Sequence, residues 1–144
     1  MSPDPWERRL SLMRGALGPM AAFIGSWEGQ GEAHGVPVHS RLEVRPILEG
    51  TLMEVLEQTG DHTDICFYRW EPDSGGYVVL HLMPGQVAEH VVEPTGDGFV
   101  WITGPSAPAV EWRQTAEGLR QEVVWPDSPE PEVWVAYTRI VDAG

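Results

Sequence analysis

The sequence of 144 residues has the length of a single domain. Hydrophobic residues make up 42% of the chain and charged residues 22%, which are ordinary values for a globular protein and argue against disorder. Its 22 acidic residues face only 9 basic residues, all of them Arg, which gives a formal net charge of −13. Such a charge repels phosphate backbones and anionic headgroups, so we expect neither nucleic acid nor a membrane as a partner.

The only cysteine, Cys66, excludes an internal disulfide and a multi-cysteine zinc site. It lies in the apolar run Ile65–Tyr68, a context that is typical of a buried thiol. The first residues lack the apolar core of a signal peptide, and no apolar stretch approaches the roughly 20 residues that span a membrane. We therefore expect a cytoplasmic protein.

Residues 1–22 read as a helical lead-in to the rest of the chain. Pro5 suits a first helical turn, and Leu10, Met13 and Leu17 recur at helical spacing. From residue 23 onward the pattern changes completely. The spacing therefore predicts a short N-terminal helix before a domain of a different class.

Residues 23–144 consist of short runs in which apolar and polar residues alternate, separated by clusters of Gly, Pro and Asp. About ten runs occur at the spacing of an antiparallel sheet, and no helical stretch of 10–15 residues lies between them. Consecutive hairpins favour a meander, and its closure removes exposed edges. We therefore predict a single all-β domain, an up-and-down antiparallel β-barrel of about ten strands with a short N-terminal helix.

The first predicted strand opens with Gly25-x-Trp27-x-Gly29-x-Gly31. This motif resembles the opening of calycin (lipocalin-like) barrels, most closely that of the nitrobindin-like and uncharacterised bacterial lipocalin-like families. The resemblance implies a barrel that encloses a ligand. In lipocalins an Arg on the last strand packs across this Trp, and Arg139 occupies that position here. We therefore expect Arg139 to stack on Trp27 where the first and last strands meet.

A second role for the C-terminal strand stays open. Fatty-acid-binding barrels hold a carboxylate with a late Arg and Tyr, and Tyr137 and Arg139 share one strand face. The pair therefore suits either a structural role or a carboxylate ligand.

Nitrobindin-like proteins hold haem through a histidine near the C-terminus. The histidines of this chain end at His90, and the last strand offers only Tyr137, which would have to bind iron as a phenolate. We therefore expect no cofactor, with a haem- or metal-binding protein as the alternative. His81 and His90 lie on neighbouring predicted strands, but a metal needs a third ligand such as Glu89 or His39, and Glu89 alternates to the face opposite His90. We predict no metal site.

Catalytic motifs are not recognisable. The Gly29-x-Gly31 pair lacks the helix that follows a dinucleotide-binding turn, and no serine lies in a nucleophile elbow. Glu54 and Glu57 fall on opposite strand faces and form no carboxylate pair. We expect no catalytic residue, but a small cofactor-free enzyme is a further alternative because a barrel interior can host a lone acid or base.

Seven tryptophans exceed what one small core needs, which leaves core packing and pocket lining equally open. We predict that the barrel binds a small, partly hydrophobic molecule. The polar side chains expected to face this ligand are His39, Arg41, Arg69, His81, His90, Arg113 and Tyr137. A register error of one residue would reverse each assignment. Aromatic residues on the outer wall would support a homodimer.

Overall fold

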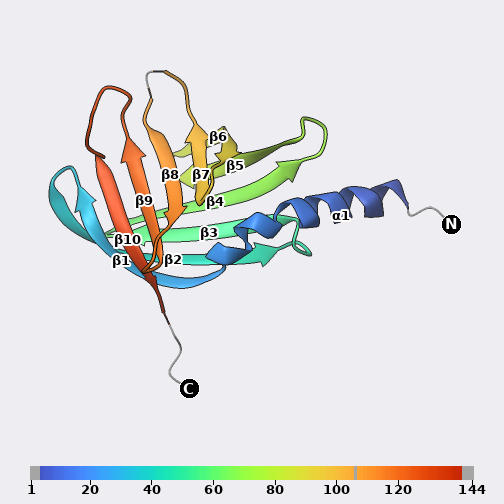
Figure 1. Ribbon diagram of the computed structural model, residues 1–144, viewed down its shortest axis with the longest axis horizontal. Helices are drawn as coiled ribbons and strands as arrows, with labels where there is room; N and C mark the ends of the chain where they lie inside the picture. The colour runs from blue at the N-terminus through green and yellow to red at the C-terminus, as the bar shows by residue number, and fades with distance from the viewer. Residues whose placement is uncertain (1–3, 106, 141–144) are drawn as a thin grey trace.

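A computed structural model describes residues 4–105 and 107–140, which form a closed barrel of ten antiparallel strands (Figure 1). An α-helix, α1 (Pro5–Ala16), and a 3-10 helix, η1 (Gly18–Phe23), precede the barrel. The strands are β1 (Gly25–Ala33), β2 (Val36–Ile47), β3 (Leu52–Thr59), β4 (His62–Glu71), β5 (Gly76–Met83), β6 (Gln86–Pro94), β7 (Gly98–Ile102), β8 (Ala109–Gln114), β9 (Leu119–Val124) and β10 (Val133–Arg139). Each strand pairs with its neighbours in sequence, and β1 also pairs with β10. The prediction of an all-β, up-and-down barrel with a short N-terminal helix is confirmed.

Alternation of buried and exposed residues sets the direction of each side chain. In β2, Ser40, Leu42 and Val44 are buried, whereas the residues between them are exposed. The turn from β1 to β2 consists of His34 and Gly35, both with positive φ (52° and 79°). Two positive φ angles are characteristic of the type I′ turn, whose twist matches that of the strands it joins. The same alternation fixes which residues line the barrel interior.

Closure brings Trp27 of β1 opposite Arg139 of β10. The Arg139 guanidinium lies 4.2 Å from the centre of the Trp27 ring and donates hydrogen bonds to the carbonyl oxygens of Ala22, at 2.9 Å, and Ile24. The indole N–H of Trp27 donates to the carbonyl of Phe23 at 3.0 Å. The expected stacking contact is confirmed, and it ties the last strand to the segment that leads into the first.

Gly25 makes this contact sterically feasible. Its φ of 140° is unfavourable for other residues, and a Cβ atom here would collide with Nη1 of Arg139. The first glycine of the motif therefore provides the space that the guanidinium occupies.

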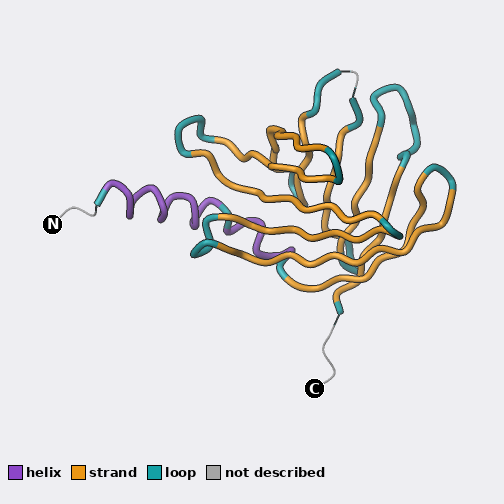
Figure 2. Tube along the Cα trace, turned by 180° about the vertical axis from the view of Figure 1, so that it is seen from behind, coloured by secondary structure: helices purple, strands orange, loops and turns teal. Residues whose placement is uncertain are grey.

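The end of the barrel next to residues 17–24, here called the helix end, is covered by η1 (Figure 2). Met20 and Phe23 of η1 are buried, and the Phe23 ring packs edge-on against Phe99 of β7 with centroids 5.6 Å apart. The hydroxyl of Tyr77 donates a hydrogen bond to the carbonyl of Ala16 at 2.5 Å. These contacts fix the helical segment on the barrel.

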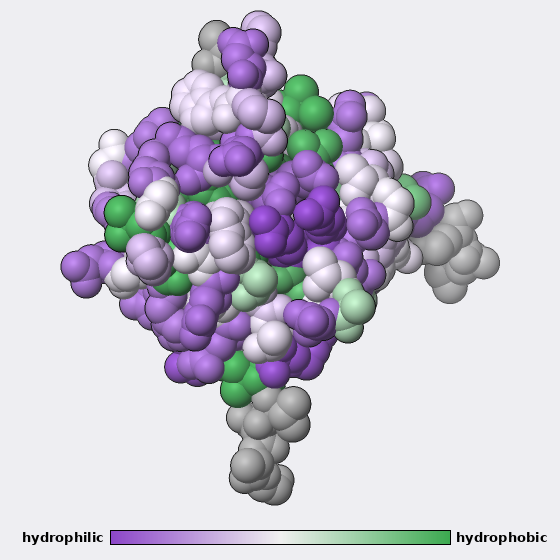
Figure 3. Space-filling model, turned by 60° about the vertical axis from the view of Figure 1, so that its left-hand side comes forward, coloured by the Kyte–Doolittle hydropathy of each residue, from purple (hydrophilic) through white to green (hydrophobic). Residues whose placement is uncertain are grey.

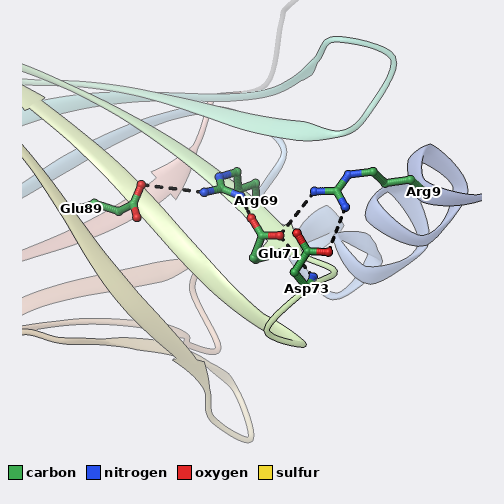
Figure 4. A network of polar contacts seen from close by, with 5 residues as sticks. All are labelled: Arg9, Arg69, Glu71, Asp73 and Glu89. Carbon is green, nitrogen blue, oxygen red and sulfur yellow. Dashed lines mark hydrogen bonds and ion pairs between the residues drawn. The ribbon is translucent and has the colours of Figure 1, made fainter. Parts of the chain in front are cut away.

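Ion pairs hold α1 against the turn between β4 and β5 (Figure 4). Arg9 lies 3.4 Å from Glu71 and 3.3 Å from Asp73. Arg69 on the outer face of β4 also pairs with Glu71, and with Glu89 at 3.9 Å. The hydrogen bond from Arg69 lowers the pKa of Glu71. Arg69 was predicted to face the ligand, and the structure places it on the outside.

The outer wall carries both polar and apolar side chains. The face in Figure 3 is largely hydrophilic, with apolar side chains in small, separate groups. Val87 and Val91 on β6 and Ile102 on β7 are exposed apolar residues of this wall. Within the described residues, no helix has the length and apolar character needed to cross a membrane. The homodimer stays a prediction.

Replacing Arg139 with Ala should lower the free energy of unfolding by about 1–2 kcal/mol, because it removes a cation–π contact and two hydrogen bonds. Arg41→Ala is the control, since Arg41 is exposed on the outer face of β2 with one ion pair at 3.9 Å. We expect this control to change stability by less than about 0.5 kcal/mol. Urea unfolding followed by circular dichroism measures both, and equal effects would contradict the role of Arg139 in closure.

Candidate functional site

Inward-facing side chains divide the barrel interior into two halves. Those near the helix end are buried, namely Val44, Met53, Val55, Tyr68, Val79, Val92, Phe99, Trp112 and Leu119. Those toward the opposite end, here called the open half, keep partial exposure to solvent, namely Val38, Glu57, Asp64, His81, His90, Val110, Gln121, Val123 and Val133. The first half is therefore largely a packed core, and the inward-facing side chains of the open half are the ones that keep contact with solvent.

Glu57 is an acidic residue inside the open half. Met53 and Val55 of β3 face inward, and the two-residue period of a strand brings Glu57 to the same face. Its carboxylate accepts a hydrogen bond from the Tyr137 hydroxyl at 2.5 Å. Protein atoms replace most of the water around the carboxyl, and this burial raises the pKa of Glu57 to about 7. The hydrogen bond from Tyr137 opposes the rise, and the charge of Asp64 adds to it.

Tyr137 reaches Glu57 by crossing over β1. Its hydroxyl also lies 2.7 Å from Oγ of Ser40 on β2, which in turn lies 2.8 Å from Oγ1 of Thr59. Gly29 of β1 pairs with both Tyr137 and Ser40, and a Cβ atom on Gly29 would lie 2.6 Å from Cδ1 of Tyr137. The missing side chain at Gly29 therefore lets the tyrosine ring lie across the strand.

The environment of Tyr137 disfavours a role as an iron ligand. Burial and the charge of Glu57 raise its pKa, so the phenol stays neutral and donates. The other inward-facing residues of β10, Val133 and Val135, carry no ligand atom. In the described part of the chain, no group of three or more His, Cys, Asp or Glu side chains is arranged to hold a metal ion.

Asp64, His81 and His90 lie on the strands that follow Glu57. Asp64 of β4 pairs directly with Glu57, and its Oδ2 lies 3.8 Å from Nε2 of His81, whose side chain is 14% exposed. His81 packs edge-on against Trp101, at 5.1 Å between centroids, and His90 stacks on the same ring at 5.5 Å. Burial, together with the charge of His81, lowers the pKa of His90, which is therefore neutral at pH 7.

Aromatic side chains pack beneath these polar groups. The indole N–H of Trp101 donates to the Tyr68 hydroxyl at 3.0 Å, and the Trp112 ring stacks on Tyr137 at an angle of 8°. Of the buried side-chain nitrogen and oxygen atoms in the described residues, Nε1 of Trp112 alone has no hydrogen-bond partner. Burial raises the pKa of the Cys66 thiol, so this cysteine is protonated and unreactive.

The outer wall, and not the interior, carries four of the predicted polar anchors. His39 and Arg41 are exposed on the outer face of β2, because Ser40 between them faces inward. Arg69 pairs with carboxylates outside the barrel, and Arg113 pairs with a glutamate of β9 at 3.3 Å. In each case the observed strand register differs by one residue from the predicted one, so the side chain points outward.

The three remaining predicted anchors, His81, His90 and Tyr137, do face the interior. Glu57 and Asp64 join them and were not recognised from the sequence as site residues. A signal existed, because each carboxylate continues the inward-facing apolar alternation of its strand.

The carboxylate-binding role of Tyr137 and Arg139 is not supported. Arg139 binds backbone carbonyls at the helix end, and Tyr137 donates to Glu57. Among the described residues, no Arg faces the open half.

A pocket of about 260 Å³ lies at the helix end, between η1 and the turn from β6 to β7. Its walls are mainly apolar and include Pro19, Met20, Phe23, Tyr77, Val92 and Phe99. It lacks the cluster of polar side chains that the open half contains.

Comparison of the sequence with models of known protein families gives no match, and comparison with curated proteins gives none either. The class of the protein therefore comes from the sheet itself, which is a ten-stranded antiparallel barrel with an N-terminal helical cap, consistent with a calycin-like barrel.

Replacing Gly29 with Ala should lower the free energy of unfolding by about 1–3 kcal/mol, because the new methyl group displaces the Tyr137 ring. Gly76→Ala is the matched control, since a Cβ atom on Gly76 meets no atom within 4 Å. Urea unfolding of both variants measures the difference. A Gly29→Ala variant as stable as Gly76→Ala would contradict the close approach of Tyr137 to β1.

The stability of the protein should depend on the protonation of Glu57. Its pKa is 4.5 in an ordinary environment and about 7 in the fold, so the folded state holds the proton more tightly. Between these two pH values stability falls as the pH rises, by at most about 3 kcal/mol. The Glu57→Gln variant should lack this loss. Urea unfolding of both proteins across this pH range measures it, and parallel curves would contradict the buried position of Glu57.

Proposed function

We propose that the protein binds a small, partly hydrophobic molecule in the open half of the barrel. The observation that carries the proposal is the contrast between the two halves of the interior. Inward-facing side chains near the helix end are buried, and those of the open half keep contact with solvent. A barrel of this size has room for one small ligand where side chains do not fill it.

The chemistry of the lining supports a mixed ligand. Val110, Val123 and Val133 provide apolar walls, and Glu57 and Asp64 provide hydrogen-bond acceptors. Small-molecule sites typically combine such an apolar lining with a few polar groups that orient the ligand. Since no described Arg faces this half and two carboxyl groups do, the site favours a neutral ligand over a carboxylate.

The haem- or metal-binding alternative rests on the Gly25–Gly31 motif together with the five histidines. His81 and His90 face the interior, but in the described residues no group of three or more His, Cys, Asp or Glu side chains is arranged to hold a metal ion, so we favour ligand binding without a cofactor.

Titration with the neutral dye N-phenyl-1-naphthylamine tests the proposal, because its fluorescence rises in an apolar site. The wild-type protein should bind one dye molecule. Val123→Trp should weaken binding by at least about tenfold, since the new ring fills the open half. Val124→Trp is the matched control, because the next residue of β9 points outward.

Gly96→Trp distinguishes the open half from the helix-end pocket. Gly96 lines the helix-end pocket, and a Cβ atom there meets no atom within 4 Å. The dye should still bind this variant. Loss of binding in Gly96→Trp but not in Val123→Trp would move the site to the helix end, and a wild-type protein that binds no dye would overturn the proposal.

A further inference from the structure

Two groups that can carry a proton face the same space in the open half. Glu57 and His81 lie on β3 and β5, and the charge of His81 is close enough to lower the pKa of Glu57. Asp64 lies between them on β4, opposite Glu57 in the sheet and 3.8 Å from the His81 ring. A carboxyl group on β3 and an imidazole on β5, separated by β4 and both facing the solvent-exposed half of the interior, provide the two groups that general acid–base catalysis needs.

The hydrogen bonds around Glu57 accommodate both of its protonation states. When the carboxylate is ionised, the Tyr137 hydroxyl donates to it and Ser40 donates to Tyr137. When the carboxyl is protonated, it donates to Tyr137, Tyr137 donates to Ser40, and Ser40 donates to the carbonyl of Gln58 at 3.0 Å. Only hydroxyl hydrogens reorient between the two arrangements. Glu57 can therefore gain or lose a proton without leaving a buried polar atom unpaired.

We propose that the open half catalyses proton transfer on a small, partly apolar ketone, moving a carbon–carbon double bond into conjugation with the carbonyl group. This inference rests on the proposed function, because the ketone must first bind inside the barrel. Glu57 and His81 are the catalytic residues, and Asp64 and Tyr137 are positioning residues.

The Glu57 carboxylate takes a proton from the carbon between the carbonyl group and the double bond. The electrons of that C–H bond form a new double bond, and the negative charge moves to the ketone oxygen. An N–H group of His81 donates a hydrogen bond to this oxygen and stabilises the charge. Glu57 then returns the proton to the far carbon of the original double bond. The protein ends in its starting state, and no oxidant or other reactant is consumed.

Asp64 and Tyr137 act through these two residues. The carboxylate of Asp64 lies beside Nε2 of His81 and holds the imidazole on the inner wall. Tyr137 fixes the orientation of the Glu57 carboxyl through its hydrogen bond.

Isomerisation of 3-cyclohexen-1-one to 2-cyclohexen-1-one, followed by proton NMR, tests the proposal. The wild-type protein should accelerate the reaction over buffer. Glu57→Gln should lose at least about 100-fold of that acceleration, because an amide cannot take the proton. Glu54→Gln is the matched control on the same strand, since Glu54 points outward and pairs with Arg45 at 2.7 Å. This control should keep the full rate.

The pH profile gives a readout that a purely structural role of Glu57 would not move. The titratable groups that face Glu57 are Tyr137 from β10, Asp64 and Cys66 from β4, and His81 from β5. The rate should rise with pH around pH 7, as Glu57 loses its proton. Tyr137→Phe removes a hydrogen bond that favours the carboxylate, so the inflection should move to higher pH.

Two results would overturn the inference. The first is a folded wild-type protein that binds the neutral dye but does not accelerate isomerisation, which would leave the proposed binding function intact. The second is a Glu57→Gln variant that is as active as the wild type. If Glu57→Gln fails to fold, as circular dichroism would reveal, the wild-type and Tyr137→Phe pH profiles decide, and the absence of an inflection near pH 7 counts against the inference.

Discussion

The pairing of β1 with β10 is the constraint on which the rest of the structure depends. It removes the two free edges of the sheet and places residues from the two ends of the chain in contact. Because β10 pairs with β1, Tyr137 of β10 reaches Ser40 of β2 and Glu57 of β3 by lying over Gly29. The glycines of β1 therefore serve two purposes. Gly25 leaves room for Arg139 where β1 meets β10, and Gly29 lets the Tyr137 ring lie over the inner face of β1.

The two halves of the barrel interior differ in what they contribute to stability. Near the helix end, aromatic and aliphatic side chains fill the space and stabilise the fold. In the open half the chain places the Glu57 carboxyl where burial raises its pKa, so its ionised form costs stability. Several hydrogen bonds offset part of this cost, as with the Tyr137 hydroxyl at Glu57. Local choices that lower stability in this way are most common at functional sites.

The fold could be predicted because strand alternation, turn residues and the Gly-x-Trp opening all indicate the same barrel. The contact between Trp27 and Arg139 followed from closure. The lining of the site was harder to predict, because it depends on the phase of each strand. Arg41 and Arg113 were expected inside, but their strands turn Ser40 and Trp112 inward instead. Register is a property of paired strands, and a single polar residue in an alternating run does not reveal it.

Glu57 was missed for a different reason. It was considered only together with Glu54, as one of two neighbouring carboxylates, and the two point to opposite faces. Its actual neighbours come from strands distant in sequence, since Tyr137 lies 80 positions away along the chain. Contacts of this kind arise from closure and have no local signature.

One side chain, Arg139, stabilises both the attachment of η1 and the junction of β1 with β10. The guanidinium of Arg139 holds the carbonyl groups that lead out of η1 and at the same time rests on the ring of Trp27 in β1. Lifting η1 from the barrel would therefore also loosen the junction between the first and last strands. Because of this coupling, the helix end contributes to the stability of the whole barrel and is poorly suited to open for a ligand. The proposed ligand would therefore have to enter from the opposite end, where the turns that join β1 to β2, β3 to β4 and β5 to β6 lie.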